Sequence, residues 1–165
     1  MSTLPSVRAD RQRLVVVAGL VWLAADRLLV QRRGANASHG AGRLELPGGK
    51  VEPGEAPRAA LTRELTEEWG PHAGLLTLLA VAEVLHHIYP EPGPEVLLVV
   101  YHVDASAWAG SGPDGEYWPA LVRATDGASV HAFAREALPL DDFLAADRGF
   151  LAEVRAGRVH RPALS

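Results

Sequence analysis

Cysteine is absent from the 165-residue sequence. Its absence excludes a disulfide framework, a thiolate-bound zinc ion and a thiol nucleophile. A chain without cysteine fits a reducing compartment, so we expect a cytoplasmic protein. The sequence also contains neither the G-x-S-x-G turn that carries a nucleophilic serine nor the GK[ST] motif of a phosphate-binding loop.

An excess of positive charge is also missing, because 16 Lys and Arg residues face 20 Asp and Glu residues and give a net charge of −4. Duplex nucleic acid requires a basic surface, so we expect no such partner. The longest apolar run, at residues 14–25, follows arginines as in a signal peptide, but a bilayer span takes about 20 apolar residues. A polar turn at Asp26-Arg27 leads into a second apolar run. We therefore expect a β-hairpin here, with no membrane partner.

The length of the chain suits a single domain over residues 1–165, with peripheral tails at 1–12 and 157–165. Apolar runs bounded by turn residues predict strands at 14–23, 27–32, 44–46, 75–89, 95–103, 120–124 and 129–134. Gly and Pro residues mark the ends of a predicted helix at 55–69, and a second helix is expected at 144–156. This mixture predicts an α+β fold with helices packed on a mixed sheet.

Carboxylates concentrate in the predicted helix at 55–69. Glu64, Glu67 and Glu68 project from one side of it, since successive helical residues turn by about 100°. They lie beside an apolar stripe that recurs every four residues and consists of Leu61, Leu65 and Trp69. Acids at the boundary of a core suit a hard divalent cation such as Mg²⁺, which prefers oxygen ligands. The alternative is a solvated acidic face with arginine partners.

The spacing of these acids is more specific than their number. From Gly49 the chain has five residues, Glu55, seven residues, Arg-Glu-Leu, one residue, Glu-Glu, one residue and Gly70. This pattern resembles the signature of the Nudix hydrolase family at every defined position except the last, where Pro71 replaces an aliphatic residue. The preceding QRRGANASHGAGRLELPGGKVE resembles the second strand, loop and third strand of the MutT-like branch. A looser resemblance extends over residues 14–155.

The resemblance implies a Nudix fold, in which a mixed β-sheet is sandwiched between helices. It also implies a site for Mg²⁺, with Mn²⁺ as a substitute, whose ligands are Gly48, Glu64, Glu67 and Glu68. One of these glutamates, or a later carboxylate, would orient or deprotonate the attacking water. Glu55 and Arg63 match the supporting pair of the family, and Asp126 matches an ancillary metal ligand with a shorter side chain.

Several residues outside the fixed positions of the signature are candidates for nucleotide binding. Lys50 and Arg33 would contact phosphate from the rim of the site, although a solvated strand end is an equal alternative for Arg33. Asp147 follows an F-x-x-A motif, where the MutT-like branch contacts the base, and it equally suits the cap of the last helix. Trp108 and Trp118 would either stack on a base or cap the core.

The resemblance to the MutT-like branch implies hydrolysis of a nucleoside triphosphate, including a damaged or non-canonical one, to monophosphate and pyrophosphate. Dinucleoside polyphosphates, ADP-ribose and other nucleotide sugars are alternative substrates, because Tyr89 and Pro90 lie at offsets typical of those branches. A non-catalytic nucleotide-sensing module is an alternative from another class. Members of the family often dimerise, so a homodimer is an open alternative.

Overall fold

The computed structural model describes residues 11–110 and 117–164. Within this part of the chain the strands are β1 (Arg13–Ala24), β2 (Arg27–Arg32), β3 (Leu44–Glu45), β4 (Gly48–Lys50), β5 (Thr77–Ile88), β6 (Glu95–Asp104) and β7 (Ser129–Ala134). The helices are α1 (Pro57–Trp69), α2 (Trp118–Leu121) and α3 (Ala145–Arg155). Short 3₁₀ turns are η1 (Pro71–Leu75), η2 (Ser106–Trp108), η3 (Arg135–Ala137) and η4 (Leu140–Asp142).

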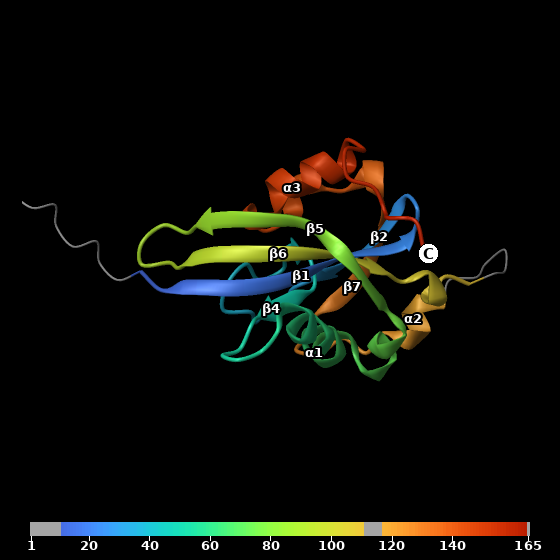
Figure 1. Cartoon of the computed structure of the whole chain (residues 1–165), viewed down its shortest axis with the longest axis horizontal. Coiled ribbons are helices and arrows are strands. Elements are labelled where there is room, and N and C mark those ends of the chain that lie inside the picture. Colours follow the sequence, from blue (N-terminus) through green and yellow to red (C-terminus); the bar gives the residue numbers. More distant parts are fainter. Residues whose placement is uncertain (1–10, 111–116, 165) are drawn as a thin grey trace, which may run out of the picture.

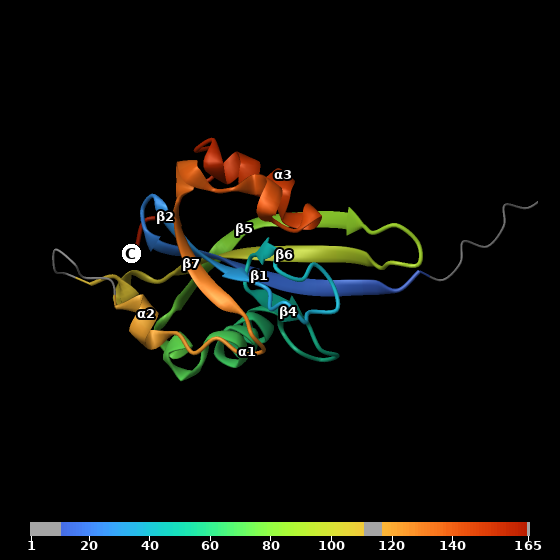
Figure 2. The same cartoon turned by 180° about the vertical axis from the view of Figure 1, so that it is seen from behind.

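The strands form one mixed sheet whose main order is β3-β2-β1-β6-β5. Strand β1 is central: it is parallel to β6 and antiparallel to both β2 and β4. Strands β1, β6 and β5 run side by side in Figure 1. Strand β7 pairs with β2 and is seen in front of it from the opposite side (Figure 2). This topology brings β4 and β2, which carry residues of the site, to the same edge of β1, opposite β6.

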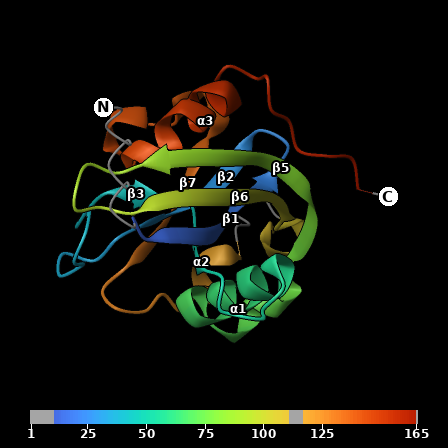
Figure 3. The same ribbon diagram turned by 60° about the vertical axis from the view of Figure 1, so that its left-hand side comes forward.

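Helices cover both faces of the sheet, with α1 and α3 on opposite sides (Figure 3). Ala18, Leu20 and Trp22 of β1 belong to the core that includes α3, whereas Val17 and Val21 belong to the core that includes α1. Because β1 is buried on both faces, its sequence is a continuous apolar run rather than an alternating one. The predicted α+β fold, a mixed sheet between helices, is therefore confirmed.

Helix α1 is bounded by the proline and the glycine that the sequence indicated as its ends. Pro57 occupies its first turn, where the missing N–H costs nothing, and Gly70 ends it with a φ of 92°. The predicted apolar stripe is confirmed, because Leu61, Leu65 and Trp69 are 0%, 1% and 0% exposed. The helix starts two residues later than expected, so Glu55 lies in the turn before it.

Two other expectations need correction. Residues 120–124 do not form a strand: Trp118–Leu121 is the short helix α2, whose first turn accommodates Pro119. The glycines after Pro47 do not simply end a strand, because Gly48–Lys50 pairs with β1 as β4. The predicted strand at 75–89 is β5, which has register shifts between Leu78 and Glu83.

Of the two predicted peripheral tails, the N-terminal one lies mostly outside the described residues. In the C-terminal segment, Val159 packs against the core, and Nη1 of Arg161 lies 3.4 Å from Oδ1 of Asp104. No helix in the described ranges has the length and apolar character needed to cross a membrane.

Candidate active site

Strand β4 lies close to both β1 and helix α1 because two of its residues are glycines without side chains. A Cβ on Gly48, whose φ is 154°, would lie 2.0 Å from the carbonyl oxygen of Val17. A Cβ on Gly49 would lie 2.3 Å from the carboxyl carbon of Glu64. The N–H of Gly48 donates to Oε2 of Glu68 over 3.1 Å. The glycines thus allow backbone and two glutamates to meet, which larger residues at these positions would prevent.

Arg63 joins the acids of α1 to the turn before the helix. Its Nε and Nη2 donate to the two carboxylate oxygens of Glu55 over 2.8 and 2.9 Å. Its Nη1 donates to Glu64 over 2.7 Å and to Glu67 over 3.2 Å. Nη2 also donates to the carbonyl oxygen of Lys50 over 3.0 Å, which ties the guanidinium to β4. The hydrogen bond from Arg63 lowers the pKa of Glu55 to about 2.

The three glutamates of α1 occupy different environments. The side chain of Glu64 is 16% exposed, and that of Glu67 is 59% exposed. Burial raises the pKa of Glu68 to about 8, and the nearby charge of Glu45 adds to the effect. An acid in this state favours a nearby cation, because a cation would offset the cost of its negative charge.

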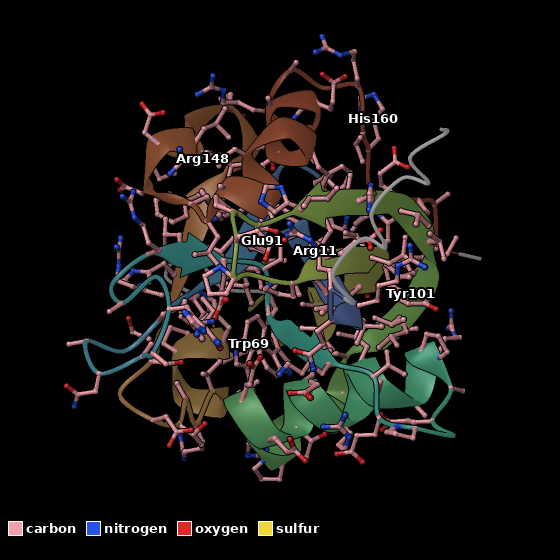
Figure 4. All side chains as sticks on the ribbon, turned by 90° about the vertical axis from the view of Figure 1, so that its left-hand side faces the viewer. Arg11, Trp69, Glu91, Tyr101, Arg148 and His160 are labelled. Carbon is pink, nitrogen blue, oxygen red and sulfur yellow. The ribbon has the colours of Figure 1, made fainter. Side chains whose placement is uncertain are left out.

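Glu68 lines a cleft of about 500 Å³. The next residue of the helix, Trp69, is labelled in Figure 4. The cleft is lined by Gln31, Arg33, Gly34, Asn36, Ala37, Ser38, Glu45, Glu68, Thr125, Asp126 and Ala128. Its walls therefore combine carboxylates from α1 and β3 with one guanidinium from the end of β2. This combination suits a ligand that carries both negative charge and hydrogen-bonding groups.

The turn that carries Asp126 is fixed against α1. The N–H of Arg123 donates to the carbonyl oxygen of Trp69 over 2.8 Å, and the Thr125 hydroxyl donates to that of Glu67 over 3.3 Å. On the other side, a Cβ on Gly34 would lie 2.4 Å from the Asp126 carbonyl oxygen. Asp126 itself is exposed and lines the same cleft as Glu68. The structure thus places this sequence candidate beside the acids of the helix.

The three candidate substrate-binding residues lie in different places. Arg33 lines the cleft, where its Nη1 donates to Glu45 over 2.7 Å, so it is more than a solvated strand end. Lys50 is exposed on β4 and lies outside the cleft lining. Asp147 is 5% exposed in the first turn of α3 and accepts a hydrogen bond from the Leu46 N–H over 3.3 Å. It is not the helix cap, which is Leu144.

Other expectations about side chains are also decided by burial. Trp108 is 0% exposed and packs near Trp69, with ring centroids 6.0 Å apart, so it caps the core rather than presenting a stacking surface.

Gln31 and Glu45 line the cleft but were not singled out from the sequence. The available signal was the polar Gln31 at the end of the apolar run LLV, although that pattern alone does not distinguish a buried amide from a strand end.

The oxygen donors of this region fit a hard divalent cation in kind but are not gathered around one point. Among the described residues, no three His, Asp or Glu side chains stand close enough together to enclose a metal ion. Glu64 and Glu67 instead point to Arg63, while Glu68 points to the Gly48 N–H. The fit rests on the carboxylate held in the space that a Gly49 side chain would fill and on the buried carboxyl group of Glu68.

A mixed sheet between helices, with a carboxylate-rich helix beside a glycine turn, defines the class of nucleotide pyrophosphohydrolases expected from the sequence. The family model described as the NUDIX domain matches residues 12–154, so the chain belongs to this family. The expected enzyme class, a Nudix-type pyrophosphohydrolase, is confirmed.

Relatives of known name and structure agree with this assignment. The 8-oxo-dGTP diphosphatase of Escherichia coli K12 is 33% identical over 114 residues, which are 67% of this chain and 83% of the relative. The solved E. coli ORF135 protein is 26% identical, with a TM-score of 0.64, and the match covers 94% of this chain and 97% of that one. The MutT protein of Methanosarcina mazei Go1 has a TM-score of 0.67 at 19% identity, over 91% of this chain and 98% of that chain, and supports the fold alone.

Gly49→Ala should displace the Glu64 carboxylate and lower hydrolytic turnover by about a hundredfold, because a shift of about 1 Å in an active-site group has effects of this size. The thermal midpoint should change little, since the displaced group is the end of a flexible side chain. Steady-state kinetics and thermal unfolding measure both. Gly74→Ala is the matched control, because a Cβ there has no atom within 4 Å. Full turnover by Gly49→Ala would mean that the observed position of Glu64 is not needed.

Asp147→Asn should stabilise the protein at pH 8 but not at pH 4. Burial raises the pKa of Asp147 from 3.8 to about 7, so the unfolded state loses this proton first. The stability of the wild type should therefore fall, relative to the variant, as the pH rises from about 4 to 7, by up to about 4 kcal/mol. Thermal unfolding across this range measures the difference, and Asp142→Asn, which removes an exposed carboxylate, is the control. A stability difference between the wild type and Asp147→Asn that does not change with pH would contradict the raised pKa of Asp147.

Proposed function

We propose that the chain hydrolyses a nucleoside triphosphate to a nucleoside monophosphate and pyrophosphate, with Mg²⁺ as the cofactor. An oxidised purine nucleotide such as 8-oxo-dGTP is the proposed substrate. The observation that carries the proposal is the cleft that Glu68, Asp126 and Arg33 all line. The choice of substrate is supported by the 33% identity with a relative named 8-oxo-dGTP diphosphatase.

The proposed metal ligands are the carbonyl oxygen of Gly48 and the carboxylates of Glu64, Glu67, Glu68 and Asp126. A bound Mg²⁺, or Mn²⁺ in its place, would neutralise phosphate charge and lower the pKa of bound water. Arg63 holds Glu64 and Glu67 on one side of α1 through its Nη1. Glu55 in turn holds Arg63 with two parallel hydrogen bonds, a geometry that fixes both distance and orientation.

In the proposed reaction, Glu67 or Glu68 orients a water molecule and takes its proton. The water oxygen bonds to a phosphorus of the triphosphate, and the bond from this phosphorus to the bridging oxygen breaks. The bridging oxygen leaves with pyrophosphate, and the nucleoside monophosphate is released. Because phosphoryl transfer needs little covalent participation by the protein, positioning and electrostatic stabilisation account for most of the catalysis.

Arg33 and Lys50 are the proposed phosphate contacts, with Arg33 in the cleft lining and Lys50 exposed on β4. Asp147 is the proposed contact to the base. Its pKa of about 7 means that its carboxyl group is partly protonated near neutral pH. A protonated carboxyl group offers one donor and one acceptor, which matches a base edge that presents an acceptor beside an N–H. Burial raises the pKa of the Tyr89 phenol, and the nearby charge of Asp147 adds to the effect.

Glu67→Gln and Glu68→Gln should each lower turnover by a factor of roughly 10² or more, because each removes negative charge from the proposed metal site. Both variants should keep the wild-type fold by circular dichroism. The assay resolves monophosphate and pyrophosphate by chromatography, with 8-oxo-dGTP, unmodified triphosphates, ADP-ribose and a dinucleoside polyphosphate as substrates. Free pyrophosphate from a triphosphate supports the proposal. Faster cleavage of ADP-ribose or of the dinucleoside polyphosphate would show that this compound, and not a triphosphate, is the substrate.

Glu136→Gln is the control for loss of one negative charge, because Glu136 is exposed in η3. It should retain wild-type turnover. EDTA should abolish turnover by the wild type, and Mg²⁺ in excess should restore it. Full activity in EDTA, or in both glutamine variants of α1, would overturn the mechanism. A cytoplasmic location and a homodimer stay predictions that fractionation and sedimentation would test.

A further inference from the structure

Arg58 occupies a position in α1 where the physics of an isolated helix disfavours a cation. It lies in the first turn, directly after Pro57, and that turn contains no acidic residue. Ala56, which precedes the helix, has no side-chain oxygen that could accept from the free N–H groups. Because the start of a helix carries a partial positive charge, a guanidinium there is repelled. The reason for an arginine at this position must therefore lie outside the helix.

The guanidinium of Arg58 contacts β5 and β6. Its Nη1 donates to the carbonyl oxygen of Leu79 over 2.8 Å, and its Nη2 donates to that of Leu78 over 2.7 Å. Its central carbon lies 5.5 Å from the centroid of the ring of Tyr101, a residue of β6 that is labelled in Figure 4. Tyr101 is 7% exposed and belongs to the core that includes α1. Two charge-assisted hydrogen bonds and a cation–π contact thus join the helix to the sheet.

An irregularity of β5 presents both carbonyl oxygens to one side chain. In a regular strand, successive carbonyl groups point in opposite directions, so one guanidinium would not reach both. Between Leu78 and Val81, however, β5 shifts its register with β6, and we call this stretch the β5 bulge. Bulges redirect groups of a strand and recur beside active sites. The β5 bulge and Arg58 are therefore two halves of one contact.

This contact holds one end of the helix that carries the acids. At the other end, the N–H of Arg123 donates to the carbonyl oxygen of Trp69 over 2.8 Å. Glu64 lies between the two ends, about 9 Å along the helix axis from Arg58. Its carboxylate occupies the space that a side chain at Gly49 would fill. Because a short helix is stiff, the position of this carboxylate relative to β4 depends on both ends being held.

We propose that Arg58 is a positioning residue for the metal site, which anchors the first turn of α1 to the β5 bulge and so sets the distance between the acids of the helix and β4. Within the described ranges, the guanidinium donates hydrogen bonds only to β5, so Arg58 acts through the helix. The inference rests on the proposed function for its kinetic consequences, but its effects on metal binding and on the helix are measured without substrate.

Arg58→Met tests the anchor, because methionine keeps an unbranched stem and a high helix propensity but has no N–H donor. At saturating Mg²⁺ we expect kcat to fall by about tenfold and the KM for the nucleotide to change by less than about twofold, since a small displacement of the acids affects the chemical step. Calorimetric titration of the substrate-free protein with Mn²⁺ should show several-fold weaker binding. Charge alone predicts the opposite, because loss of one cation favours binding of another. Tighter or unchanged Mn²⁺ binding would overturn the proposal.

Hydrogen exchange of the α1 amides supplies a second test that needs neither metal nor substrate. If Arg58 acts only within its own helix, its removal should relieve repulsion at the helix start and slow the exchange. If Arg58 anchors the helix, Arg58→Met should accelerate the exchange several-fold, and slower exchange would contradict the anchor. Arg58→Lys keeps the charge but loses the planar fork, so its exchange rate and Mn²⁺ affinity should be intermediate. Wild-type values for Arg58→Lys would mean that the pair of hydrogen bonds is not the anchor.

Two controls separate the anchor from general effects. Arg155→Met makes the same change at an exposed arginine of α3, on the opposite side of the sheet, and should leave kcat and Mn²⁺ affinity unchanged. Val154→Ala removes a fully buried side chain from α3 and should lower the thermal midpoint without weakening Mn²⁺ binding.

The two proposals fail in different ways. If the wild type hydrolyses none of the nucleotides, the proposed function fails, whereas weaker Mn²⁺ binding and faster exchange in Arg58→Met would still support the anchor. Faster exchange with unchanged Mn²⁺ binding would make Arg58 a contact for stability alone and would overturn its role in the metal site, whatever the substrate.

Discussion

The hydrogen bonds of Arg63 are the interactions on which the rest of the site depends. One guanidinium joins the turn at Glu55, the strand β4 through the carbonyl of Lys50, and two glutamates one turn apart on α1. Without it, like charges at this spacing would destabilise the helix by about 0.2–0.5 kcal/mol per pair. The same cation therefore makes a cluster of acids compatible with folding and holds those acids in one orientation.

Close approach of backbone to side chain is the second constraint, and it explains the two glycines of β4. Gly48 lies against the backbone of β1, and Gly49 leaves space for the Glu64 carboxylate. The position of β4 depends in turn on its pairing with Val16, Val17 and Ala18 of the central strand. The site is thus held by the central strand of the sheet, which gives its acids a rigid support.

The sequence contained the parts of this arrangement that depend on spacing along the chain. The 3.6-residue period of α1 predicts that Leu61 and Leu65 are buried and that the acids lie beside them, and both features are observed. Features that depend on contacts between distant segments were not predictable in this way. The Trp69–Gln31 hydrogen bond joins residues 38 positions apart, and the sequence alone left two roles open for Trp108, stacking on a base or capping the core. A local pattern also misassigned α2, where a proline in the first turn favours a helix over a strand.

The uneven distribution of positive charge among the glutamates explains why one acid differs from the others. Within the described part of the chain, Arg63 bonds to Glu64 and Glu67 but not to Glu68. In that part of the chain, Glu68 accepts a hydrogen bond from the neutral Gly48 N–H, and the nearby charge of Glu45 disfavours its ionised form. Neutral donors orient a carboxylate without cancelling its charge, whereas an ion pair would do both. Glu68 is therefore both fixed in direction and short of a counter-charge, which are the two properties that a ligand for a divalent cation requires.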